Sequence, residues 1–170
     1  MEAGVTAYKF LAPGAVGPFT GFRWAVGEWV EAEGPLDPCV NGVHAVTTED
    51  LAAWLHEELW RIELDGETVA VDGVLVGRRG RLAGRVEGWN PGAAREFARA
   101  CAGRARAWHD VPAAARYAAD AATFAERASS ARDAAEVGYV SAVAAAYAED
   151  GGFAAERARQ ASWLAERLGL

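Results

Sequence analysis

The change in sequence pattern at Asn90-Pro91-Gly92 constrains the fold more than any other feature of the chain. Before it, short apolar runs alternate with polar residues and end at turn dipeptides such as Asp65-Gly66 and Asp72-Gly73, which is typical of strands. After it, 29 of the 79 residues in 92–170 are alanine, the best helix former. The sequence therefore predicts an α+β protein: a sheet domain over residues 1–91, and an alanine-rich helical region over 92–170 packed on it.

The first half is predicted to form a small, mainly antiparallel sheet with one helix. Thr47 and Asp50 form a capping-box pattern, which predicts an α-helix that begins there and ends near Glu58, with Leu51, Trp54 and Leu55 on one face. Strands are predicted at residues 8–11, 22–24, 28–30, 42–46 and 60–64, followed by a meander of strands at 68–71, 74–78 and 81–87.

The second half is predicted to form about four helices. The first carries Phe97 and Cys101 on one face, and the second begins at Pro112 and is lined by Tyr117, Ala121 and Phe124. Val137 lies about 200° from Tyr117 around a single helix axis, so a new helix is predicted to begin at Ser130, where Asp133 completes another capping box. The last helix follows Gly151-Gly152.

Charge and composition favour some classes of partner over others. Residues 1–91 hold fourteen acidic and seven basic side chains, whereas residues 92–170 hold ten of each. An acidic surface repels phosphate backbones, so no nucleic-acid partner is expected. No stretch is apolar enough to span a membrane, no secretory signal is visible, and two cysteines in unlike contexts are expected to be reduced. These features predict a cytoplasmic protein without a membrane partner.

Residue types capable of acid/base or nucleophilic chemistry gather around the segment Cys39-Val40-Asn41-Gly42-Val43-His44. His44 titrates near neutrality and could act as an acid or base, and Cys39 could contact a ligand or act as a nucleophile. The alternative for both is a structural role within a buried strand. Cys39, His44, His56 and Glu57 lack the paired spacing of zinc modules, so no metal site is predicted. No motif identifies a cofactor.

Tryptophans and two further charged residues complete the candidate site. Five of the seven tryptophans fall in the first half, and Trp24, Trp29 and Trp60 are predicted to line an apolar pocket, with core packing as the alternative. Lys9, the only lysine in the chain, and Glu87, which ends a predicted strand, are predicted to join His44 as catalytic residues.

Three segments of the first half form a recognisable series: 7–10 (Ala-Tyr-Lys-Phe), 21–28 (Gly-Phe-Arg-Trp-Ala-Val-Gly-Glu) and 39–45 (Cys-Val-Asn-Gly-Val-His-Ala). Together they resemble an uncharacterised domain family of phages and bacteria. The family pattern places a second cysteine where this chain has Val46. Any role of a cysteine pair in that family therefore does not carry over.

Residues 5–88 are more distantly similar to small domains with the ADP-ribosyltransferase-like fold, through the Gly-x-His strand, the Thr-capped helix and the strand that follows. The resemblance implies that Lys9 occupies a basic position on the first strand, His44 a position on a central strand and Glu87 that of a terminal glutamate. Lysine stands at the first position in place of arginine or histidine.

Three hypotheses for function follow. The leading one is a small-ligand-binding α+β domain that uses acid/base chemistry around His44 in a tryptophan-lined cleft. The first alternative is a non-catalytic interaction or assembly protein, in which residues 92–170 bind a second copy or a protein partner. The second alternative, implied by the resemblance, is NAD-dependent ADP-ribosyl transfer.

Overall fold

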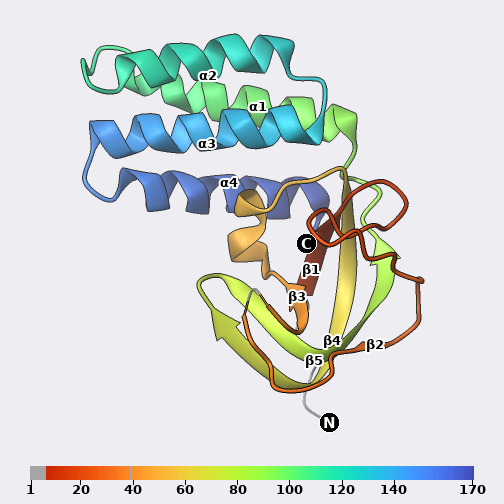
Figure 1. Cartoon of the computed structure of the whole chain (residues 1–170). Coiled ribbons are helices and arrows are strands. Elements are labelled where there is room, and N and C mark those ends of the chain that lie inside the picture. The colour runs from red at the N-terminus through yellow and green to blue at the C-terminus, as the bar shows by residue number, and fades with distance from the viewer. Residues whose placement is uncertain (1–6, 39) are drawn as a thin grey trace. The chain divides into compact units, whose positions relative to one another are not determined.

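The computed structural model describes residues 7–38 and 40–170 and has the α+β fold that the sequence predicts (Figure 1). Within these residues the strands are β1 (Ala7–Leu11), β2 (Val30–Glu31), β3 (Val43–Ala45), β4 (Glu58–Val71) and β5 (Val74–Arg85). The α-helices are α1 (Pro91–Ala105), α2 (Ala115–Arg127), α3 (Ala131–Ala148) and α4 (Gly152–Leu168), and the 3-10 helices are η1 (Thr48–Ala53) and η2 (Arg106–Trp108).

The chain divides into two compact units. The first comprises the residues up to Leu51 together with Glu58–Glu87, and the second comprises Ala52–Glu57 together with Gly88–Leu170. Two hydrogen bonds join the short segment to the rest of the second unit: Arg157 Nη1 donates to the Ala52 carbonyl at 3.1 Å, and Trp89 Nε1 donates to the His56 carbonyl at 2.7 Å. The backbone therefore passes from one unit to the other three times.

The sheet of the first unit closes on itself. β4 pairs antiparallel with β1 and with β5, and β3 pairs with β5. Tyr8 and Val46 then exchange two backbone hydrogen bonds of 2.8 Å each, which join the residue after β3 back to β1. β1, β4, β5 and β3 thus form a ring like a small barrel. β2 pairs antiparallel with β5 at Arg79 and Gly80.

A single long hairpin of β4 and β5 replaces the meander, so that prediction is wrong. β4 continues through Asp65-Gly66, with a shift of register between Asp65 and Thr68. Gly66 has a φ of 76° there, a conformation that glycine adopts without strain and that is typical of a bulge. The turn lies at Asp72-Gly73, where φ is 47° and 77°, as a two-residue hairpin turn requires.

The helix predicted after Thr47 is a 3-10 helix, not an α-helix, and it ends at Ala53. The Asp50 amide donates to the Thr47 carbonyl three residues back, at 3.3 Å, which is the hydrogen-bond spacing of a 3-10 helix. The capping pattern correctly marks where the turn begins, but so short a segment gains little from α-helix propagation. Leu51 is buried and Trp54 is 40% exposed, so the predicted shared face does not include the tryptophan.

Four helices make up most of the second unit, as predicted, and α3 contacts the other three (Figure 1). The predicted cap of α3 is confirmed: Ser130 Oγ accepts from the Asp133 amide at 3.2 Å, and Asp133 Oδ2 accepts from the Ser130 amide at 3.0 Å. The buried face of α2 consists of alanines, among them Ala121, while Tyr117 and Phe124 are only half-buried. In the described part of the chain, no helix has the length and apolar character to cross a membrane.

Candidate functional site

Lys9 lies on the inner face of the ring of strands. Ala7 and Leu11, two positions away on either side, are fully buried in the apolar core of the first unit. Because alternate residues of a strand share a face, the partly buried Lys9 side chain enters the same space as these core residues. A cationic residue is thus placed where the pattern of the strand would put an apolar one.

Two groups lie next to the Lys9 amine, and a third side chain faces Lys9 from β4. Nζ donates to the His44 carbonyl at 2.6 Å and lies 5.4 Å from the centre of the Trp24 ring. Trp60 stands directly opposite Lys9 on β4, at a distance where side chains of paired strands touch. Desolvation disfavours the ammonium form and lowers the pKa of Lys9 from 10.5 to about 8. At pH 7, roughly a tenth of the amine is therefore uncharged.

His44 lies on β3 between two buried core residues, Val43 and Ala45, so its side chain is on the opposite face of the strand from theirs. Desolvation and then the charge of Lys9 lower the pKa of His44, against the opposing effect of its Nδ1 contact with the Gly42 carbonyl at 3.0 Å. The imidazole is therefore mostly neutral at pH 7. The structure brings Lys9 and His44 together, through a hydrogen bond to the backbone carbonyl of His44.

Gly42 allows β3 to approach β5 closely enough for this arrangement. Its φ is 135°, and a Cβ at this position would collide with the side chain of Val76 on β5. Any other residue would combine backbone strain with a steric clash. The Gly-x-His pattern seen in the sequence thus has a packing explanation.

A buried carboxylate, Glu58, lies two positions before Trp60 on the same face of β4. Trp60 Nε1 donates to Glu58 Oε2 at 3.1 Å, and Arg85 Nη1 forms an ion pair with Glu58 Oε1 at 3.3 Å. Arg85 is the partner of Trp60 on β5, just as Lys9 is its partner on β1. Lys9, Trp60 and Arg85 therefore form a row across three strands, which we call the Lys9 row.

Glu58 also fixes the loop after β1. The amides of Gly14 and Ala15, whose φ values are 80° and 57°, each donate to one of its oxygens at 3.0 Å, and consecutive amides of this kind make an anion-binding nest. Desolvation raises the pKa of Glu58, but the Gly14 amide, the indole, the Ala15 amide and the charge of Arg85 lower it overall. Since the Trp24 amide donates to the Ala15 carbonyl at 3.0 Å, the same loop positions Trp24.

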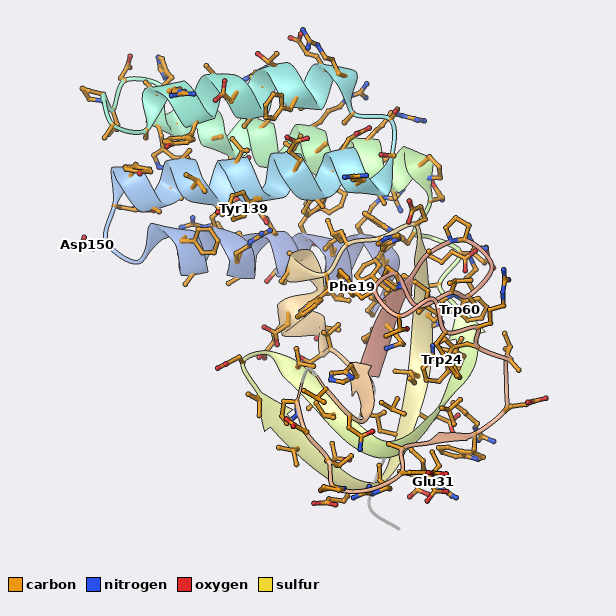
Figure 2. The ribbon with its side chains drawn as sticks, viewed as in Figure 1. Phe19, Trp24, Glu31, Trp60, Tyr139 and Asp150 are labelled. Atoms are coloured by element: carbon orange, nitrogen blue, oxygen red, sulfur yellow. The ribbon has the colours of Figure 1, made fainter. Side chains whose placement is uncertain are left out.

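Trp24 and Trp60 both pack against the apolar core of the first unit and lie in the same part of it (Figure 2). Phe22 meets Trp24 edge to face, with ring centres 5.4 Å apart. Phe22 is 46% exposed, whereas Trp24 is half-buried. Aromatic side chains therefore extend from the surface to the Lys9 amine.

Trp29 lies in another part of the unit, although the sequence groups it with Trp24. Its ring is 4.5 Å from the Arg79 guanidinium and 4.8 Å from that of Arg81, a cation–π arrangement with the long hairpin. Glu31, two residues further on, lies well apart from Trp24 in Figure 2. The structure thus gives Trp29 a packing role on β5.

Glu87 and Cys39 complete the predicted site residues. Glu87 follows β5, and its carboxylate is 3.9 Å from Arg85 Nε and 81% exposed. It therefore adjoins the Lys9 row at the Arg85 end. Cys39 lies outside the described residues, so its predicted ligand contact stays a prediction.

Sequence reasoning missed Glu58 and Arg85, although a signal for Glu58 was present. Residues 60, 62 and 64 are the apolar positions of an alternating strand, and Glu58 has the same phase. A carboxylate in phase with an apolar face is expected to be buried and therefore paired. Arg85 gave no comparable signal, because its position depends on how β4 and β5 pair.

A second buried polar cluster lies within the helical unit. Arg104 Nε and Nη2 donate to Glu156 Oε1 at 3.0 and 2.8 Å, and Gln160 Nε2 donates to the same oxygen at 3.1 Å and to the Gly138 carbonyl at 2.9 Å. Burial raises the pKa of the neighbouring Cys101 to about 12, so the thiol is neutral and unreactive. These contacts join α1, α3 and α4, which indicates a structural role.

The helical unit also carries exposed aromatic side chains. Tyr139 is 54% exposed and meets Phe153 edge to face at 6.0 Å, and Tyr147 stacks on Tyr117 with ring centres 5.0 Å apart. Figure 2 shows Tyr139 between α3 and α4. The hypothesis that residues 92–170 bind a second copy or a protein partner stays a prediction.

Comparison of the chain with protein-family models, curated proteins and solved structures found no match. The resemblances to a phage and bacterial domain family and to ADP-ribosyltransferase-like domains therefore stay predictions.

Proposed function

We propose that the first unit binds a small molecule with a flat apolar body and a carbonyl or carboxylate oxygen, through the Lys9 amine and the indoles of Trp24 and Trp60. The observation that carries the proposal is the placement of Lys9 Nζ on the inner face of the strand ring, fixed by the His44 carbonyl. An ammonium has three N–H donors. The His44 carbonyl takes one of them, which leaves donors for a ligand oxygen.

Electrostatics support an oxygen-bearing ligand. Among residues 7–38 and 40–170, no carboxylate forms an ion pair with Lys9, whereas Arg85 at the other end of the row is paired with Glu58. A partly desolvated ammonium attracts an oxygen acceptor more strongly than one in water. Two half-buried indoles beside it offer flat apolar surface for the rest of the ligand.

The same geometry bears on acid/base chemistry. A group with a pKa of about 8 is present in both protonation states near neutral pH, as an efficient acid or base requires. The His44 imidazole, whose pKa is lowered, is mostly neutral at pH 7. We therefore assign direct ligand contact to Lys9 and the positioning of the amine to the backbone of His44.

Two aromatic carboxylates, benzoate and indole-3-acetate, test the proposal. Each is titrated into the intact protein while thermal unfolding and tryptophan fluorescence are recorded. We expect stabilisation of the wild type, and a loss of affinity of about tenfold or more in Lys9→Met, equivalent to about 1.4 kcal/mol. Trp24→Phe should also weaken binding, whereas Trp29→Phe is the matched control and should not. Equal affinity of wild type and Lys9→Met, or no response to either carboxylate at millimolar concentration, would refute the proposal.

A further inference from the structure

The surroundings of the Lys9 amine suit a covalent reaction with a carbonyl carbon. Nζ is held by one hydrogen bond of 2.6 Å to the His44 carbonyl and faces the Trp24 ring at 5.4 Å. Lysines that are desolvated in apolar pockets are the ones that form Schiff bases in proteins. Resting on the proposed function and narrowing its ligand class, we propose that Lys9 forms an imine with an apolar aldehyde or ketone bound against Trp24.

The reaction balances without any further reagent. The neutral Lys9 amine adds through its nitrogen lone pair to the carbonyl carbon, and the carbonyl π electrons move to the oxygen. Proton transfer from nitrogen to oxygen gives a carbinolamine. Loss of the oxygen as water, with both amine hydrogens, then leaves a C=N bond. The process involves no oxidation or reduction, and addition of water reverses it.

The contacts around Nζ also suit the product. When the imine nitrogen takes up a proton from solvent, it carries one N–H, and the His44 carbonyl that now accepts from Lys9 can accept from it. The positive charge of this iminium would remain beside the Trp24 ring, where a cation is favoured. The apolar residues Ala7 and Leu11 flank Lys9 on β1, and such surroundings slow hydrolysis by limiting access of water.

The aromatic side chains favour an apolar carbonyl compound over a polar one. Phe22 is 46% exposed and meets Trp24 edge to face, so aromatic surface extends from solvent toward Lys9. A benzene ring beside Trp24 would bring an attached aldehyde carbon near the amine. A sugar aldehyde would find no comparable set of hydrogen-bonding groups at Phe22 and Trp24.

Reductive trapping with benzaldehyde and sodium cyanoborohydride at pH 7 tests the proposal in the intact protein. Lys9 is the only lysine, so peptide mapping assigns an adduct at Lys9 unambiguously and separates it from an adduct at the α-amino group of Met1. The matched control is the double variant Lys9→Arg with Arg95→Lys, which places the lone lysine at an exposed site of α1. We expect Lys9 to be trapped about tenfold faster than the lysine at position 95, because far more of its amine is neutral at pH 7.

The outcomes separate this inference from the proposed function. The rate advantage of Lys9 should also disappear when the wild type is unfolded in urea, a measurement that does not depend on any variant folding. If Lys9 is trapped no faster than the exposed lysine, the proposal that Lys9 forms an imine is wrong. If benzoate still binds in a Lys9-dependent manner, the proposed function then stands alone. If benzoate does not bind either, both proposals fall.

Discussion

A lysine on the inner face of a strand lowers the stability of the fold as long as it carries a charge. Lys9 lies between two fully buried residues, Ala7 and Leu11, and burial lowers its pKa to about 8. The difference from the ordinary value of 10.5 lowers the free energy of unfolding by about 3 kcal/mol at neutral pH. Residues that reduce stability in this way are concentrated at functional sites, which is consistent with the role proposed for Lys9.

The variant Lys9→Met is therefore expected to be more stable than the wild type at pH 7, by about 2 kcal/mol after allowing about 1 kcal/mol for the lost hydrogen bond to His44. Between pH 8 and 10.5 the unfolded state binds more protons at Lys9 than the folded state, so the wild type gains stability as the pH rises. The difference in free energy of unfolding between Lys9→Met and the wild type should therefore shrink over the same range. Urea unfolding of both proteins at pH 7, 8, 9 and 10 measures this difference.

Titration of Cys101 changes the free energy of unfolding of both proteins with pH, but it does not change the difference between Lys9→Met and the wild type. The pKa of Cys101 is raised from 9.0 to about 12 in the folded state, so both proteins lose stability as the pH rises through this range. The comparison between variant and wild type cancels this effect. Arg95→Met, an exposed change, serves as the control and should show no pH-dependent difference. A constant difference between Lys9→Met and the wild type from pH 7 to 10 would contradict the prediction.

Among the structural elements, the loop after β1 depends most on a single side chain. Both oxygens of Glu58 accept hydrogen bonds, from the Gly14 and Ala15 amides and from Trp60, and Arg85 neutralises the charge. An amide at this position would present an NH₂ group to N–H donors. We expect Glu58→Gln to lower the free energy of unfolding by about 2–3 kcal/mol at pH 7, because hydrogen bonds are lost and a donor is left unpaired.

The pH dependence gives a second test of Glu58. Because its pKa in the folded state is depressed, the stability it contributes is present above its ordinary pKa and is lost as the pH falls through the lowered value. Urea unfolding at pH 7 and pH 3 should therefore show a smaller gap between Glu58→Gln and the wild type in acid. Glu63→Gln removes an exposed pair with Arg81 and should have little effect at pH 7. If Glu58→Gln lowered the free energy of unfolding no more than Glu63→Gln does, Glu58 would not be what fixes the loop after β1.

Elements were predictable from sequence where the signal is local. The capping box at Ser130 and Asp133 identified the start of α3, since the residues that form it are three positions apart. The turn predicted at Asp65-Gly66 is wrong, because whether a glycine makes a turn or a bulge depends on the partner strand. The closure of the sheet through Tyr8 and Val46 is non-local and left no trace in either segment.

The candidate site was predictable only in part, for the same reason. Lys9 and His44 belong to strands that the sequence identified, and the structure brings them together. That they meet through a backbone carbonyl depends on the ring of strands, which no side-chain pattern encodes. The sequence groups Trp29 with Trp24 only because both are tryptophans of the first half. Only the pairing of β2 with β5 separates them.

At the scale of the whole molecule, the path of the backbone links the two units. Ala52–Glu57 belongs to the helical unit but lies in sequence between β3 and β4 of the sheet unit. The hydrogen bonds to the Ala52 and His56 carbonyls fix this segment within the helical unit. If the helices unfold, the segment loses its attachment, and the ends of β3 and β4 lose a restraint on their positions.

We therefore expect the two units to unfold in one transition rather than two. Hydrogen exchange measured by mass spectrometry at increasing urea should give peptides from β4 and α3 the same dependence on urea, since a cooperative unit opens as a whole. Alkylation of Cys101, which is fully buried and neutral in the folded state, should follow the same curve and reports independently on the helices. A urea concentration at which α3 and Cys101 stay protected while β4 exchanges completely would show that the chain crossings do not couple the units.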